Sequence, residues 1–211
     1  MLSLVTVAAV GYLLFFSSLL GVTSVAVTGL HRVSKDAVLR LAQVSEGAPL
    51  LRVDTAAAEE RIASLPQVAE VTVGRSLPTT ITIEVVERMP LAYAKEAKGV
   101  RLVDRAGVAF HRAAKVPKSL PELRTAKFGP RDPATKAAMA VLGGVPDKLR
   151  EKIRVIRAST PGDVQFTLAG GKRVLWGDQR QSDRKAQVLA ALLSRPGEVY
   201  DVSSPELPTV R

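Results

Sequence analysis

The first thirty residues carry no charged side chain and no histidine, and this feature constrains the fold more than any other. Every Asp, Glu, Lys, Arg and His lies in residues 31–211. Residues 2–22 read LSLVTVAAVGYLLFFSSLLGV, which as a helix would span about 30 Å, the hydrocarbon thickness of a bilayer. A soluble helix of this length normally has a polar face, and this segment has none. We therefore predict a transmembrane helix over residues 1–23, followed by aqueous domains.

A cleaved signal peptide is the alternative interpretation of this segment. Ser24, Val25 and Ala26 place small residues at positions that a signal peptidase prefers. However, the apolar run exceeds the usual h-region of about 7–15 residues, and no basic segment precedes it. Cleavage after Ala26 would also cut the first predicted strand. The uncleaved anchor is therefore favoured.

The charge pattern does not decide the orientation of the predicted helix. The positive-inside rule, applied alone, would place the basic C-terminal side inside the cell, but long domains translocate largely regardless of their charge. We expect a cytoplasmic N-terminus and extracytoplasmic C-terminal domains at the cell membrane. Because the sequence starts within its own membrane helix, we also expect a cytoplasmic tail upstream of this start.

A first domain with the order β-α-α-β-β is predicted after the membrane helix. Its two helices follow Ser34 and Asp54, residue types that cap helix N-termini. In its last strand Ile81, Ile83 and Val85 alternate with polar residues and are expected to point inward. Two helices can then cover one face of a three-stranded sheet, an α+β arrangement. The strands are expected over residues 24–28, 68–74 and 80–87 of a domain that covers residues 24–91.

The remaining residues predict a second, mainly antiparallel β domain with flanking helices. In the second helix Ala186, Leu189 and Leu193 form an apolar stripe. Several prolines between residues 116 and 130 indicate a loop. Within residues 92–211 the strands are expected at 92–97, 100–104, 108–110, 153–158, 164–169, 172–176 and 198–203, and the helices at 132–142 and 182–193.

Several segments of the first domain, taken in order, resemble one known family. They are Val27-Thr28-Gly29-Leu30, Gly47-Ala48-Pro49-Leu50-Leu51-Arg52-Val53-Asp54, Arg61-Ile62-Ala63-Ser64-Leu65-Pro66-Gln67-Val68, the run from Val71 to Thr80, and Glu87-Arg88-Met89-Pro90-Leu91-Ala92. Together they resemble the bacterial cell division family FtsQ/DivIB, whose domain after the membrane helix is of the POTRA (polypeptide-transport-associated) type. The second half resembles the β domain of that family, because Gly177 is followed by Lys185 and a Leu-Ala-Ala-Leu-Leu run.

The resemblance implies a non-enzymatic membrane scaffold at the division septum, which binds FtsB/DivIC-type and FtsL-type partners and helps to regulate septal wall synthesis. In such proteins the end of the β domain captures the FtsB/DivIC-type partner as an added strand. An edge strand exposes unpaired N–H and C=O groups for this purpose. Carried over to this sequence, the partner-binding candidates are Glu198, Val199, Tyr200, Asp201, Val202 and Ser203.

Tyr200 is the strongest of these candidates, because a half-exposed tyrosine offers both apolar area and a hydroxyl group to a partner. The alternative is that Tyr200 merely packs beneath the predicted helix over residues 182–193.

Residues that could support catalysis or metal binding are scarce. The chain has no cysteine, and His31 and His111 are its only histidines. Neither a Gly-x-Ser-x-Gly elbow nor a phosphate-binding Gly-x-x-x-x-Gly-Lys loop occurs. We therefore expect no enzyme activity, no metal and no cofactor.

The net charge of +10 raises the question of an anionic partner. The basic residues are scattered and are not interleaved with aromatic ones, so nucleic acid is not an expected partner. Outside the cell the charge can face anionic lipid or acidic wall polymers, or simply solvent. Three alternatives to the division scaffold stay open: a POTRA module in protein export, a cleaved secreted binding protein, and a membrane-bound enzyme with unrecognised chemistry. The lack of a nucleophile–base pair disfavours the last of these.

Overall fold

The computed structural model describes residues 21–96 and 99–211. The chain divides into two compact units between Arg88 and Met89, three residues before the predicted division. The predicted membrane helix falls mainly in residues 1–20, outside the described residues. Within the described ranges, none of the helices combines the length and the apolar character needed to cross a bilayer.

Residues 21–23, which the sequence placed in the membrane helix, belong to the first domain. Gly21 forms an isolated β-bridge with Pro49. The Val22 N–H donates to the Ala48 carbonyl oxygen at 2.9 Å, and the Val22 side chain is buried in the domain core. This domain therefore begins no later than Gly21.

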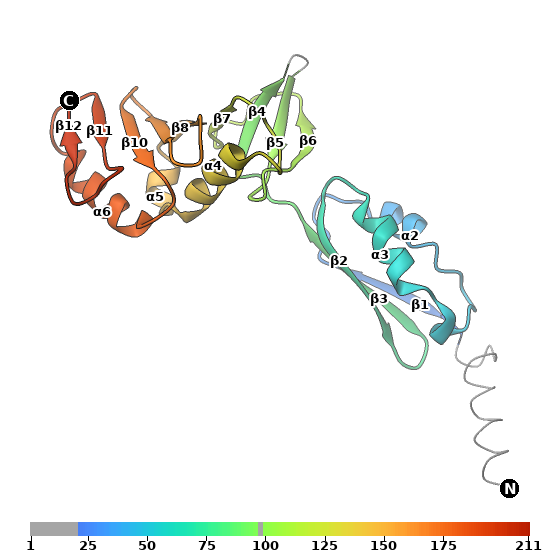
Figure 1. Ribbon diagram of the computed structural model, residues 1–211. Coiled ribbons are helices and arrows are strands. Elements are labelled where there is room, and N and C mark those ends of the chain that lie inside the picture. The colour runs from blue at the N-terminus through green and yellow to red at the C-terminus, as the bar shows by residue number, and fades with distance from the viewer. Residues whose placement is uncertain (1–20, 97–98) are drawn as a thin grey trace, which may run out of the picture. The chain divides into compact units, whose positions relative to one another are not determined.

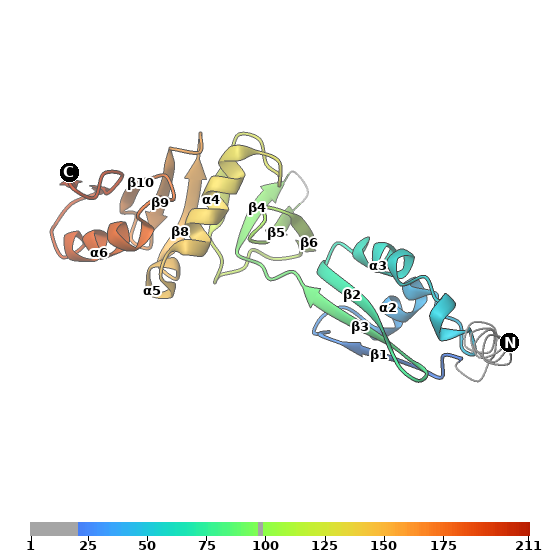
Figure 2. The ribbon, with the colours of Figure 1, turned by 60° about the horizontal axis from the view of Figure 1, so that its bottom comes forward.

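The first domain has the predicted β-α-α-β-β order and is confirmed as an α+β unit (Figure 1). Strand β1 is parallel to β3, and β2 is antiparallel to β3, so the sheet order is β1-β3-β2. Figures 1 and 2 both show α2 and α3 over the same face of this sheet. The elements are β1 (Ser24–Thr28), α2 (Lys35–Ala42), the 3-10 turn η2 (Leu50–Arg52), α3 (Thr55–Ala63), β2 (Val68–Ser76) and β3 (Thr80–Glu87).

The two predicted helix caps differ in the structure. Asp54 caps α3 as expected, because its carboxylate accepts a hydrogen bond from the Ala57 N–H at 3.0 Å. Ser34 occupies the N-cap position of α2, but its side chain makes no capping hydrogen bond. In β3 the inward alternation is confirmed, since Ile81, Ile83 and Val85 are all buried in the core.

The Glu87 carboxylate joins the end of β3 to the loop that follows β1. Its Oε1 accepts hydrogen bonds from the His31 and Val33 N–H groups at 2.7 and 2.8 Å, and the Arg32 N–H lies 2.9 and 3.0 Å from the two carboxylate oxygens. Partial desolvation raises the pKa of Glu87, but these backbone hydrogen bonds together hold it below its ordinary value. The ionised carboxylate therefore stabilises the loop.

The second domain contains one nine-stranded sheet with the order β12-β11-β10-β9-β8-β7-β4-β5-β6. Most neighbouring strands are antiparallel, as predicted, and three neighbouring pairs are parallel. The elements are β4 (Ala92–Glu96), β5 (Gly99–Val103), β6 (Ala109–Ala113), β7 (Glu122–Thr125), α4 (Pro133–Gly144), α5 (Asp147–Arg150), β8 (Ile153–Ala158), β9 (Val164–Leu168), β10 (Arg173–Gly177), α6 (Ser182–Leu192), β11 (Val199–Asp201) and β12 (Thr209–Val210).

Strand β7 lies in the segment that the sequence predicted as a loop, so that prediction is wrong. This strand pairs in parallel with β4 on one side and with β8 on the other, and it thereby joins the two parts of the sheet. It has only four residues and follows Pro121 directly. A segment this short shows no recognisable alternation of apolar and polar residues. It forms a strand because it pairs with a strand on each side.

The second core lies between the sheet and helices α4 and α6. The rings of Phe166 and Trp176 are 5.2 Å apart in this core. The apolar stripe predicted on α6 is confirmed at Leu189, which is fully buried, whereas Leu193 is half-buried and Lys185 is buried instead.

We predict that Glu87→Gln destabilises the first domain by about 1–2 kcal/mol at neutral pH, because charge-assisted hydrogen bonds are replaced by weaker ones. The folded-state pKa of Glu87 lies below the ordinary 4.5. The contribution of the carboxylate is therefore complete above that pH and is lost as the pH falls through the folded-state value. The difference between the wild type and Glu87→Gln should shrink at about pH 3.

Urea titrations at the two pH values, read by hydrogen exchange of first-domain peptides in the full chain, measure this difference. Glu84→Gln is the matched control, because Glu84 is exposed on the same strand. An equal effect of both substitutions would contradict the role given to Glu87.

Candidate protein-binding site at the end of the second sheet

The predicted last strand is not the edge of the sheet. Strand β11 pairs in parallel with β10 and in antiparallel with β12, so it has a neighbour on each side. It covers three residues rather than the predicted six. Strand β12 was not predicted, because Pro205 and Pro208 argue against a long continuation of the chain as a strand. The two residues directly after Pro208 nevertheless form a strand against β11.

Tyr200 is completely buried, so the expectation of a half-exposed tyrosine is wrong and the alternative of packing holds. Its hydroxyl donates to the carbonyl oxygens of Arg195 and Gly197, at 2.8 and 3.1 Å. The Lys172 Nζ lies 5.1 Å from the centroid of its ring. Tyr200 therefore holds the turn between α6 and β11 against the core.

The other five candidates have different surroundings. Val202 is buried and donates its N–H to the Leu175 carbonyl oxygen at 2.9 Å. Val199 and Asp201 are half-buried, whereas Glu198 and Ser203 are exposed. The accessible candidates therefore lie at the two ends and on the outer surface of β11.

Strand β12 is one of the two edge strands of the sheet, and β6 is the other. Val199 and Arg211 exchange two backbone hydrogen bonds of 2.8 and 2.9 Å. In an antiparallel ladder such a bonded pair alternates with a pair that does not bond to each other. Val210, opposite Tyr200, is in the second kind of pair. Its N–H and C=O therefore point away from β11, toward the open side of the terminal strand.

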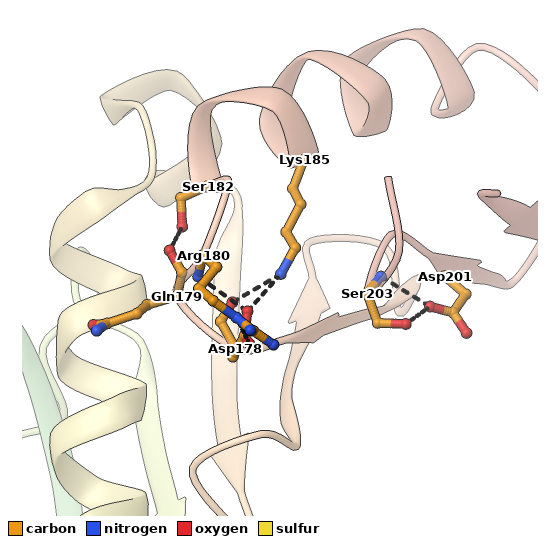
Figure 3. A network of polar contacts seen from close by, with 7 residues as sticks. All are labelled: Asp178, Gln179, Arg180, Ser182, Lys185, Asp201 and Ser203. Carbon is orange, nitrogen blue, oxygen red and sulfur yellow. Dashed lines mark hydrogen bonds and ion pairs between the residues drawn. The ribbon is translucent and has the colours of Figure 1, made fainter. Parts of the chain in front are cut away.

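A buried ion pair supports this end of the sheet (Figure 3). The Lys185 side chain is only 2% exposed, and its Nζ donates to the backbone carbonyl oxygen and the carboxylate of Asp178, at 3.0 and 3.1 Å. Arg180 also contacts the Asp178 carboxylate. Desolvation raises the pKa of Asp178, but the bonds from Lys185 and Arg180 together lower it. The pair fixes the start of α6 to the end of β10.

The loop after β11 faces this ion pair across a polar pocket. The Ser203 backbone N–H and hydroxyl both donate to Asp201 Oδ1, at 3.0 and 2.7 Å, which shapes the start of the loop (Figure 3). Gly177 has a φ of 79° and faces Ser203 so closely that a Cβ would lie 3.1 Å from the Ser203 Cβ. A polar pocket of about 330 Å³ separates the loop residues 203–206 from Asp178 and Lys185.

The chemistry of this region suits the binding of a peptide. Residues 21–96 and 99–211 contain no group of three or more His, Asp or Glu side chains that could hold a metal ion. What the region offers is an open strand edge, exposed side chains on both sides of it, and a rigid support. The sequence pointed to Gly177 and Lys185 only through the family resemblance, because nothing in the pattern of α6 indicates that a lysine is buried.

We predict that Lys185→Met destabilises the second domain by about 2–3 kcal/mol, because it leaves the Asp178 carboxylate without its buried partner. The double variant Lys185→Met with Asp178→Asn should recover part of this loss, since it removes the carboxylate and the only charge that loses its partner is the solvent-exposed Arg180. Urea unfolding followed by the fluorescence of Trp176, the only tryptophan in the chain, measures both effects. Additive losses in the double variant would show that the pair is not coupled.

Comparisons with known proteins cover both domains. The family model for the POTRA domain, FtsQ-type, matches residues 20–88, and the model for the cell division protein FtsQ/DivIB, C-terminal, matches residues 92–204.

Curated relatives agree with these matches. The chain is 41% identical to the cell division protein FtsQ of Mycolicibacterium smegmatis over 98% of its own length and 62% of that protein. It is 34% identical to the FtsQ of Corynebacterium glutamicum over 98% of its own length and 94% of that protein. The solved extracytoplasmic domain of DivIB from Geobacillus stearothermophilus aligns at 17% identity, with a TM-score of 0.37, over 46% of this chain and 84% of that one. The two family models and the identities to FtsQ proteins show that this chain belongs to the FtsQ/DivIB family of bacterial cell division proteins.

Proposed function

We propose that the protein is a non-enzymatic, single-pass membrane scaffold of the division machinery, with a cytoplasmic N-terminus and both described domains outside the cell. In this role it binds FtsB/DivIC-type and FtsL-type partners and helps to regulate septal wall synthesis. Membership of a cell division family supports a role in cell division. The open edge of β12 supports binding of a partner by strand addition.

The observation that carries the proposal is the orientation of the Val210 backbone. Its N–H and C=O face the open side of a nine-stranded sheet, and a partner strand can bond to them as the next strand of the ladder. Leu207, just before β12, is 81% exposed and offers apolar area beside this edge. Glu198 and Ser203 are accessible polar neighbours that can contribute specificity.

The buried candidates have an indirect part in this proposal. Tyr200 and Val202 hold β11 in the sheet, and β11 in turn holds β12. Substitution of Tyr200 is therefore expected to weaken partner binding by disturbing the support of the edge, and direct contact is left to the accessible residues.

The net positive charge of the chain comes from the second of the two domains. Residues 89–211 hold 23 Lys and Arg against 12 Asp and Glu, a net charge of +11, whereas residues 21–88 hold 7 against 8. Such an excess attracts acidic partners. We assign the proposed weak contact with anionic lipid or wall polymer to the second domain. The POTRA-type domain, which is nearly neutral, is proposed to contact other division components.

The cellular test is localisation. We expect a fluorescent fusion at the N-terminal end to form a band at the division site, and depletion of the protein to give filamentous or branched cells. A uniform membrane signal with normal division would refute the division scaffold and favour a role in protein export or as a secreted binding protein.

The molecular prediction concerns Val210→Pro. Proline removes the outward N–H but leaves the inward bonds of the neighbouring residues in place, and an edge strand tolerates this. Binding of the extracytoplasmic segment of the FtsB/DivIC-type partner should weaken by at least about tenfold, measured by titration calorimetry on the full chain in nanodiscs.

Val210→Thr is the matched control, because it has nearly the same shape and keeps the N–H. Its affinity should stay within about threefold of the wild type. Wild-type affinity in Val210→Pro would show that the partner does not add to this edge.

A further inference from the structure

The helical side of the second domain carries a groove that is separate from the proposed binding edge. A groove of about 690 Å³ separates α6 from α5 and the turn that follows α5. Figures 1 and 2 both show these two helices on the same side of the sheet. No residue of β11 or β12 lines this groove. It is lined by Pro146, Lys148, Leu149, Lys152, Asp183, Ala186, Gln187, Leu189, Ala190 and Leu193.

The floor of the groove is apolar, and the groove is long enough to hold about three turns of a helix. Ala186, Ala190 and Leu193 recur every three or four residues on α6 and so share one face. Leu189 closes the floor from the core, and Leu149 contributes from α5. Between residues 183 and 193 the α6 wall extends for about 15 Å, or about three turns.

The two walls carry different charges. On the α5 side, Lys148 and Lys152 are exposed and four residues apart, and the bonds Glu151 N–H to Asp147 O and Lys152 N–H to Leu149 O keep this turn helical. Neither ammonium group has a carboxylate within 4 Å among the described residues. On the opposite wall the polar groups are Asp183 and Gln187. The groove is therefore positive along one rim.

The groove suits a helix better than a strand. Both of its walls are helical, and their backbone groups bond within their own turns, so an added strand would find no ladder to join. A helix satisfies its own backbone and needs only an apolar face and matching charges. From this geometry we infer that the groove binds an amphipathic α-helix of another protein, with leucine-like side chains on the floor and carboxylates along the rim of Lys148 and Lys152.

This inference does not depend on strand addition at β12. A partner could occupy the groove and the edge together, or the groove alone. Val210→Pro should leave helix binding unchanged, so failure of one proposal can be told from failure of the other.

The probe is a synthetic, fluorescein-labelled helical peptide of about 14 residues, or about four turns. It has leucines at i, i+4 and i+7 positions and glutamates along one flank only. Its two comparison peptides carry lysines in place of the glutamates, or the same residues in scrambled order. Anisotropy titrations use the full chain in nanodiscs of zwitterionic lipid, with empty nanodiscs as the blank.

Two pairs of variants test the site. Ala190→Trp fills the groove, whereas Ala191→Trp places the same side chain at an exposed neighbour that does not line it. Lys148→Glu with Lys152→Glu reverses the rim, whereas Lys115→Glu with Lys118→Glu makes the same charge change at exposed residues elsewhere. We expect losses of at least about tenfold in affinity for the acidic peptide in the groove variants, and changes within about twofold in the controls. The variant Lys148→Glu with Lys152→Glu should also bind the lysine peptide more tightly than the acidic peptide.

Three results would overturn the inference. The acidic peptide could bind no better than the scrambled one. Alternatively, Ala190→Trp and Ala191→Trp could have equal effects. Finally, sedimentation could show a wild-type dimer that Ala190→Trp dissociates, in which case a second copy of the chain occupies the groove. A far-UV circular dichroism spectrum and a urea midpoint like those of the wild type show that a variant is folded. If Ala190→Trp does not fold, the variants with reversed lysine charges still test the groove.

Discussion

The parallel pairing of β10 with β11 is the constraint on which the proposed binding edge depends. Two parallel neighbours cannot be joined by a hairpin, so the chain must leave the sheet, cross it and return. Helix α6 makes this crossing, and the Lys185–Asp178 pair fixes its first turn to the end of β10. On the return Tyr200 enters the core, and the chain then turns back as β12. The position of the β12 edge therefore depends on this crossover. The Lys185–Asp178 ion pair holds the start of the crossover, and the buried Tyr200 holds its end.

The same crossover creates the groove on the helical side. An α6 that lay flat on the sheet and touched α5 along its whole length would leave no space for a partner. Instead, Leu189 and Leu192 pack into the core while Ala190 stays exposed, so small side chains line the gap toward α5. One helix thus supports a strand edge at one end and forms the wall of a groove along its side. The net charge of +11 in this domain favours acidic ligands at both surfaces.

Much of the fold could be predicted from local patterns. The strand from Thr80 to Glu87 and the cap at Asp54 agree with the structure, because alternation and capping are properties of a few neighbouring residues. Where pattern and structure disagree, the cause is pairing between distant residues. Strand β7 is too short for any period and exists because β4 and β8 flank it. Strand β12 follows Pro208, which argued against a long continuation, yet its two residues pair with β11.

At the candidate site, too, local patterns predicted some features and contacts between distant segments decided the others. The sequence by itself determined the α+β class, the β-α-α-β-β order and the family, because these follow from residue types in their local order. The segment from Glu198 to Ser203 became a candidate only through the family resemblance. Only the tertiary structure decided that Tyr200 is buried, that Val210 presents the open edge, and that Glu87 and Lys185 hold distant segments together. The reason is physical: burial and unpaired backbone groups depend on which segments become neighbours in space, and no local pattern records that.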